Sequence, residues 1–270
     1  MDQKNSPKEN TPNSGSSEKK LGSKENKKES KKEKHMPFTD HLEELRMRLF
    51  KVIGSIVGSG LICYMFAEHI LNILTAPAPD DIVLIYLRPT GGFIVFLKVS
   101  FFAGVLISMP VIIYQFWQFV APGLFPNEKK RVFPIVLFTV LCFSVGAVFA
   151  YSIVIPLGLS FLSTFRTETM VPNWTVDDFI SFVIMLMLVF GLVFELPLVA
   201  LFLGKIGLID SKLMVKYRRH ALFGAVVFGA VLTPPDFVTQ IALAIPLWLL
   251  YEISIVLVRV FCKKSDEEEN

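Results

Sequence analysis

Two glutamates stand where their chemistry could act together, because each lies beside an apolar stretch long enough for a membrane span. Glu44 belongs to the segment HLEELRMR at residues 41–48, and Glu128 belongs to FVAPGLFPNEKKR at residues 119–131. A carboxylate accepts charge-assisted hydrogen bonds and can receive a guanidinium group in a two-armed contact. If both side chains lie on one face of a membrane, they predict an acidic receptor for a ligand with two positive charges.

The composition indicates the class of protein that must position these side chains. Hydrophobic residues make up 53% of the chain, 25 residues are Phe, and the mean hydropathy is +0.54. A soluble domain of 270 residues with an ordinary polar surface does not have this composition. The sequence therefore predicts a polytopic membrane protein.

Six apolar runs predict an all-α protein with six transmembrane helices, arranged as a concave, cupped bundle. A helix needs about 20 residues to cross a hydrocarbon core about 30 Å thick, and the last two spans, the fifth above all, are short for this. A tight outer hairpin and a locally thinner bilayer are expected there. The predicted parts are a charged tail at 1–37, a membrane domain at 38–262 and an acidic tail at 263–270, with spans at about 50–67, 95–119, 132–155, 179–203, 219–233 and 237–258.

The charges between the spans predict the orientation, since Lys and Arg gather on the cytoplasmic side of short loops. The region before the first span is basic, and so are the loops after the second and fourth spans. The loops after the first and third spans are mainly acidic. Both termini are therefore expected in the cytoplasm, and Glu44 and Glu128 are expected on the same cytoplasmic face.

Each glutamate also has a simpler explanation. Leu42, Leu45 and Leu49 have helical spacing, which predicts an amphipathic interfacial helix before the first span. On that helix, Glu44 and Arg48 could be an ordinary i,i+4 ion pair. Glu128 could be a helix N-terminal charge favoured by the macrodipole.

Two further acids lie within the predicted spans. Glu195 stands just before Pro197, and a carboxylate near the middle of a bilayer is expected to face protein or water. It is either a functional group or a hydrogen-bonded structural acid beside a kinked backbone. Glu252 is expected to pair with Arg259, and Lys98 is expected to extend to the membrane surface.

The tail at 1–37 is rich in Lys, Glu, Ser and Asn and is expected to be disordered. It has no apolar stretch typical of a signal peptide, and its acids and lack of Arg favour a bacterial inner membrane over an organelle. The three Cys have no paired spacing, and no cofactor or metal is expected.

At four places the chain resembles the TatC family, the multispanning core of the twin-arginine protein translocase. The resemblance covers about 38–264. It rests on the order and spacing of HLEELRMR, PVIIYQFWQFVAPGLFPNEKKR, FELP and LTPPDFVTQIALAIP. The family's outer loop often reads Pro-Thr-Glu-Ala-Phe, whereas residues 89–93 of this chain read Pro-Thr-Gly-Gly-Phe.

The resemblance implies a non-enzymatic receptor that binds twin-arginine signal peptides at the cytoplasmic face and organises proton-motive-force-driven transport of folded proteins. Its implied partners are these signal peptides, single-span TatA- or TatB-type subunits that dock on the fifth span, and further copies of the chain. The implied residues are Glu44, Arg46, Phe119 and Glu128 for signal-peptide binding, Glu195 on the concave face, and Asp236 and Gln240 at the outer hairpin.

Two other classes of protein fit the sequence less well. A proton-coupled small-molecule transporter could use Glu195, but such transporters usually contain internal repeats, and the sequence shows none. A membrane-embedded enzyme would need a constellation of metal ligands or a nucleophile. The four His residues lie near or outside the ends of the spans and provide neither.

Overall fold

The computed structural model describes residues 38–79, 82–120, 132–164, 174–232 and 237–262. Within these ranges the extended elements are helices, and the β-structure is an isolated parallel bridge between Ile85 and Thr175. The elements are α1 (Phe38–Tyr64), α2 (Ala67–Thr75), α3 (Gly91–Val120), α4 (Val132–Phe149), η3 (Ala150–Val154), α5 (Ile155–Ser163), α6 (Val176–Val193), α7 (Leu196–Lys205), α8 (Ser211–Lys216), α9 (Arg218–Leu232) and α10 (Phe237–Phe261).

Five stretches of the described chain are long and apolar enough to cross a membrane. The fifth predicted span corresponds to α9, whose 15 residues are only about 22 Å long at about 1.5 Å per residue. The all-α, polytopic class is therefore confirmed, with the short helix in the predicted fifth place. The five long stretches are Leu42–Tyr64, Gly91–Phe119, Phe133–Ser163, Val176–Lys205 and Leu243–Phe261.

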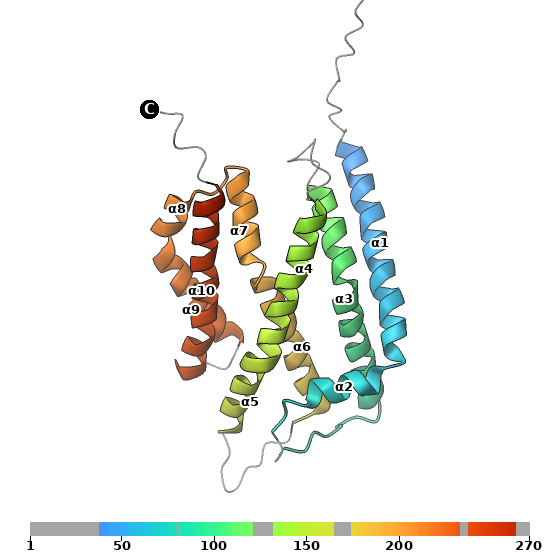
Figure 1. The fold of residues 1–270 in the computed structure, drawn as a ribbon. Coiled ribbons are helices and arrows are strands. Elements are labelled where there is room, and N and C mark those ends of the chain that lie inside the picture. Colours follow the sequence, from blue (N-terminus) through green and yellow to red (C-terminus); the bar gives the residue numbers. More distant parts are fainter. Residues whose placement is uncertain (1–37, 80–81, 121–131, 165–173, 233–236, 263–270) are drawn as a thin grey trace, which may run out of the picture. The chain divides into compact units, whose positions relative to one another are not determined.

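The first helix differs from the prediction of a separate interfacial helix, because α1 is continuous from Phe38 to Tyr64. Its predicted apolar stripe is instead the first part of one long helix, and no helix-breaking Pro interrupts it. The chain turns at Met65 and Phe66 into α2, which was not predicted. Figure 1 shows α1 running beside α3.

Small residues let α1 and α3 approach closely. A Cβ atom added to Gly104 would lie 2.7 Å from the backbone of Gly60, so only glycine fits at this crossing. Next to it, Ser59 donates a hydrogen bond to the carbonyl oxygen of Gly104 at 2.9 Å, and Ser55 donates to Ser108 at 3.0 Å. Close backbone contact with hydrogen-bonding hydroxyls is a common way to join helices in lipid.

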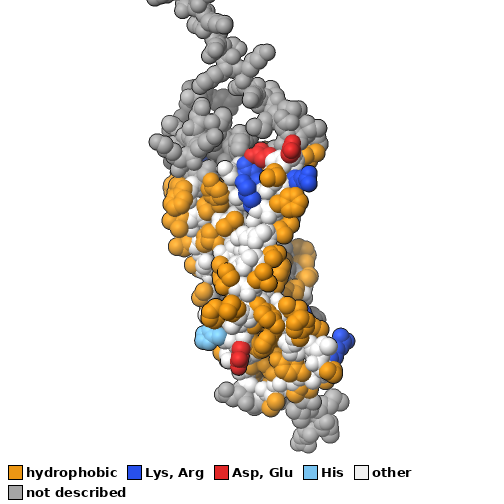
Figure 2. All heavy atoms as spheres, turned by 90° about the vertical axis from the view of Figure 1, so that its right-hand side faces the viewer, with side chains coloured by type: hydrophobic (Ala, Val, Ile, Leu, Met, Phe, Trp, Pro, Cys, Tyr) orange, Lys and Arg blue, Asp and Glu red, His pale blue; other side chains and the backbone are white. Residues whose placement is uncertain are grey.

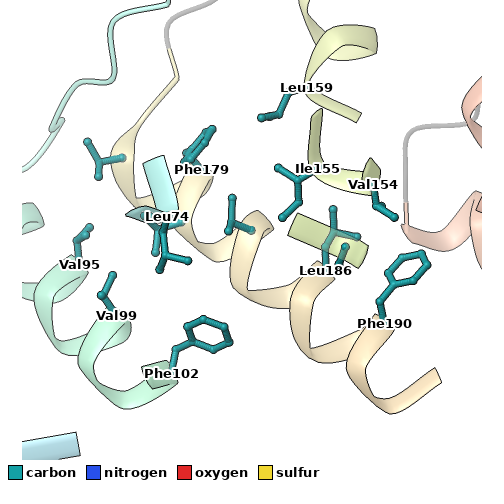
Figure 3. Packing of buried hydrophobic residues seen from close by; sticks show 14 of the residues in the cluster. Leu74, Val95, Val99, Phe102, Val154, Ile155, Leu159, Phe179, Leu186 and Phe190 are labelled. Carbon is teal, nitrogen blue, oxygen red and sulfur yellow. The ribbon is translucent and has the colours of Figure 1, made fainter. Parts of the chain in front are cut away.

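The largest buried cluster is centred on α6 and receives side chains from several helices. Figure 3 shows Phe179, Leu186 and Phe190 of α6 with Val95 and Val99 of α3. All five side chains are buried. Further members come from α2, from α3 and from the η3–α5 segment, so this core joins several helices around α6: Leu74, Phe102, Val154, Ile155 and Leu159.

Two predicted spans have different bounds in the structure. The third continues beyond residue 155 to Ser163, because the π-helical turn η3 leads directly into α5 and Pro156 occupies its first turn, where a missing N–H is tolerated. The fourth is interrupted at Phe194 and Glu195, immediately before Pro197 in the first turn of α7.

Candidate signal-peptide receptor

The N-terminal end of α1 and the C-terminal end of α3 lie at the same end of the described helices (Figure 1). Arg48 joins them: its Nη1 donates to Gln118 Oε1 at 2.8 Å and to the backbone oxygen of Gln115 at 3.5 Å. Glu44 lies one turn before Arg48 on α1, and Phe119 follows Gln118 on α3. The segment that contains Glu44 therefore lies next to the start of the segment that begins at Phe119.

The carboxylate of Glu44 accepts a hydrogen bond from Nη2 of Arg48 and forms an ion pair with it. The side chain of Arg48 is only 12% exposed, whereas that of Glu44 is 31% exposed. Glu44 is thus both an i,i+4 partner, as the simpler explanation predicts, and a carboxylate that solvent reaches. Its ion pair with Arg48 therefore leaves part of the carboxylate exposed to a ligand.

Arg46 points away from this pair, since residues two apart on a helix face different directions. Its guanidinium carbon lies 5.5 Å from the ring centroid of Phe50, a cation–π distance. Figure 2 views the side of the helical unit where α1 lies: hydrophobic side chains cover most of it, and acidic and basic ones lie toward its two ends. Arg46 therefore adds an exposed cation to α1, separate from the buried cation of Arg48.

Neighbouring helices hold the C-terminal end of α3 in place. Trp117 is buried, its Nε1 donates to Oγ1 of Thr139 on α4 at 3.2 Å, and its ring meets that of Phe202 on α7 edge-on at 4.7 Å between centroids. Phe119, two residues on, is half-buried. The predicted binding position is therefore built on an anchored helix end.

Other predicted positions lie elsewhere or outside the described residues. Glu128 and Asp236 are outside them. Gln240 is half-buried in α10, and its Nε2 donates to the backbone oxygen of Val226 on α9 at 3.1 Å, which ties the two last helices together.

Glu195 lies at the break between α6 and α7 and is half-buried. Its Oε1 is buried and has no hydrogen-bond partner among the described residues. The side chain before it, Phe194, packs against Phe149 at 5.4 Å between ring centroids. An intramembrane carboxyl oxygen without a partner is costly, which favours a role beyond packing.

The predicted pairing of Glu252 with Arg259 is wrong. Glu252 binds Arg218 at the start of α9, with 2.7 Å between Arg218 Nη2 and Glu252 Oε2. Because α9 packs against α10, Arg218 lies closer to Glu252 than Arg259 does, although Arg259 is only two turns away on the same helix. Lys98 does not simply extend to the membrane surface. Its Nζ donates to Asp177 at 2.6 Å and to Ser181 at 3.0 Å on α6.

Sequence reasoning missed the role of Gln115 and Gln118. The segment YQFWQF places two amides three residues apart in an otherwise apolar and aromatic stretch, which is the signal that could have revealed them. Their partner on α1 is far away in the sequence and could not be identified from spacing.

Comparison with protein families finds that residues 40–246 match the family model described as TatC, Sec-independent protein translocase protein. A protein of this name from Desulforapulum autotrophicum is 41% identical over 89% of this chain and 90% of its own length. Another from Aquifex aeolicus is 42% identical over 86% of this chain and 98% of its own.

Solved structures agree with these relatives. The chain is similar to a crystal structure described as twin arginine translocase receptor TatC, with a TM-score of 0.71 and 41% identity over 82% of this chain and 99% of the other. A second structure of the same receptor, in the detergent DDM, also gives a TM-score of 0.71, with 40% identity over 80% of this chain and 98% of the other.

Proposed function

Because the chain belongs to the TatC family of Sec-independent protein translocase proteins, we propose that it is the receptor subunit that binds twin-arginine signal peptides. In this role it organises the transport of folded proteins across the membrane, driven by the proton-motive force. The names of its relatives do not favour a proton-coupled small-molecule transporter based on Glu195.

The observation that carries this proposal is the hydrogen-bonded junction between α1 and α3. Arg48 and Gln118 hold the end of α1 that bears Glu44 against the end of α3 that bears Phe119. Glu128 follows only nine positions after Phe119 in the sequence, so a short ligand that binds at Glu44 has a second carboxylate within a short stretch of chain.

Arginine is the ligand that suits this pair of acids. Its planar guanidinium can contact a carboxylate through two parallel N–H donors, whereas the ammonium of lysine is a point charge without that fork. We assign Glu44 and Glu128 to the two arginines. Phe119 and Arg46 are assigned to the same recognition surface, Phe119 as an apolar contact and Arg46 as an exposed cation on the neighbouring face of α1.

Charge supports a cytoplasmic location for this surface. Basic residues cluster around the end of α7, α8 and the start of α9, which Figure 1 shows at the same end as the start of α1. Lys and Arg favour the cytoplasmic side, so both termini are assigned to the cytoplasm of a bacterial cell. This group consists of Lys205, Lys212, Lys216, Arg218 and Arg219.

The remaining predicted positions fit later steps. Glu195 is assigned to contact with the inserted signal peptide, and Asp236 and Gln240 to translocation at the outer hairpin. Single-span TatA- or TatB-type subunits are assigned to α9, and further copies of the chain complete the complex. The exposed large apolar side chains of α9 support a helix partner there, and these are Leu222, Phe223, Val227, Phe228 and Val231.

Binding of a labelled twin-arginine peptide to the purified full-length protein in lipid nanodiscs tests the proposal. Glu44→Gln and Glu128→Gln should each weaken binding by roughly tenfold or more, the scale of one lost charge-assisted contact. Glu43→Gln is the matched control, because Glu43 is exposed and adjacent to Glu44 on α1. Unchanged binding in both test variants would reject the proposal.

A further inference from the structure

The resting state of the junction contains a guanidinium that already occupies the proposed receptor acid. Arg48 donates to Glu44 through Nη2 and has a largely buried side chain. It is the same chemical group that a twin-arginine ligand would present to this carboxylate. An incoming arginine therefore meets an acid whose charge is compensated from within the protein.

Arg48 also has an alternative set of acceptors on α3. Nη1 already reaches Gln118 Oε1 at 2.8 Å and the backbone oxygen of Gln115 at 3.5 Å. Two buried atoms of the same cluster, Arg48 Nε and Gln115 Oε1, have no partner among the described residues. One is a donor and the other is an acceptor, so a shift of Arg48 toward α3 can satisfy both.

From this arrangement we infer that Arg48 is an internal competitor for Glu44, which the signal-peptide arginine displaces toward Gln115 and Gln118. The inference rests on the proposed receptor function and adds a regulatory residue to it. The exchange conserves charge pairing, because one guanidinium replaces another on Glu44. Meanwhile Arg48 keeps acceptors on α3 and does not become an isolated buried cation, which would be costly.

This exchange sets a threshold for ligands. Every ligand that uses Glu44 must replace the same internal pair, so the cost is common to all of them. A ligand with two guanidinium groups offsets this cost through bidentate contacts with the carboxylates, whereas a lysine ligand offsets less of it. Removal of Arg48 should thus tighten binding of both kinds of peptide by a similar factor.

The test compares variants of the full-length protein in nanodiscs, with labelled signal peptides that carry Arg-Arg or Lys-Lys. Arg48→Gln should bind both peptides about fivefold more tightly, the factor expected from the loss of one partly exposed competing ion pair. Arg48→Lys should return both affinities toward the wild type, since an ammonium at i+4 again neutralises Glu44. Lys51→Gln, an exposed cation one turn on, is the control for charge alone and should have little effect.

A second variant acts in the opposite direction. Gln118→Leu removes the acceptor that draws Arg48 toward α3, so Arg48 should hold Glu44 more firmly and the Arg-Arg peptide should bind about threefold more weakly. If Arg48 only supported the fold, Arg48→Gln and Gln118→Leu would both weaken binding, and this result would overturn the inference. If Arg48→Gln binds the peptides equally or more weakly, while Glu44→Gln still weakens binding, the competitor role alone is rejected. If Glu44→Gln and Glu128→Gln both leave binding of the Arg-Arg peptide unchanged, the receptor function itself is rejected.

Discussion

Arg48 donates a hydrogen bond to Gln118 at 2.8 Å, and the two residues are 70 positions apart in the sequence. This contact joins the start of one helix to the end of another and makes a single surface from two segments.

The crossing of α1 and α3 should tolerate no side chain at Gly104. A methyl group there would meet the backbone of Gly60 at 2.7 Å, so Gly104→Ala should separate the helices and destabilise the protein by about 1–3 kcal/mol. Peptide binding should fall with it, because Glu44 moves away from α3. Gly58→Ala is the matched control, since no atom lies within 4 Å of a Cβ there. Denaturant unfolding and peptide affinity measure both effects, and equal stability of the two variants would contradict the prediction.

The indole of Trp117 should stabilise the C-terminal end of α3. Trp117→Phe keeps an aromatic ring but removes the donor to Thr139, which should cost about 1 kcal/mol of unfolding free energy. The matched control is Trp248→Phe, because Trp248 is exposed on α10. Unfolding followed by fluorescence of the remaining tryptophans distinguishes the two. A larger loss in the control would show that the hydrogen bond is not what stabilises α3.

Arg218 and Glu252 should behave as a pair between α9 and α10. Arg218→Glu should destabilise the protein by roughly 0.5–1 kcal/mol, and the swap Arg218→Glu with Glu252→Arg should recover most of it, as expected for a partly exposed ion pair. Arg259→Glu provides the comparison with the partner expected from sequence spacing. A double-mutant cycle that finds coupling of Glu252 to Arg259 and none to Arg218 would reverse this assignment.

Replacement of Glu195 by glutamine should separate function from stability. The buried Oε1 has no hydrogen-bond partner among the described residues, so Glu195→Gln should leave the unfolding free energy unchanged or slightly higher. Export of a folded reporter and crosslinking of the signal peptide should both decrease, because the carboxyl group is assigned to contact with the inserted peptide. If stability drops and export is intact, Glu195 is a structural acid.

Much of the fold was predictable because it depends on local properties of the chain. Apolar length predicts where helices lie, and the 15 residues of α9 match the short fifth span expected from its apolar run. The i,i+4 pairing of Glu44 with Arg48 was also predictable, since helical geometry alone brings these positions together. The positions of helix ends were harder to predict from the sequence. Pro156 alone suggests that a helix ends there, but the π-helical turn before it leads directly into α5 and the helical stretch continues.

Tertiary structure decided the contacts between helices. Glu252 has an arginine two turns away on its own helix, yet it binds Arg218, because the packing of α9 on α10 determines which cation is nearest. The amide oxygen of Gln118 likewise accepts a hydrogen bond from Arg48, 70 positions earlier in the sequence, where α1 lies beside the end of α3. The sequence by itself determined the membrane class, the helices and the types of the candidate site residues. Which of these residues meet depends on how the helices pack, since side chains far apart in the chain interact only once their helices lie side by side.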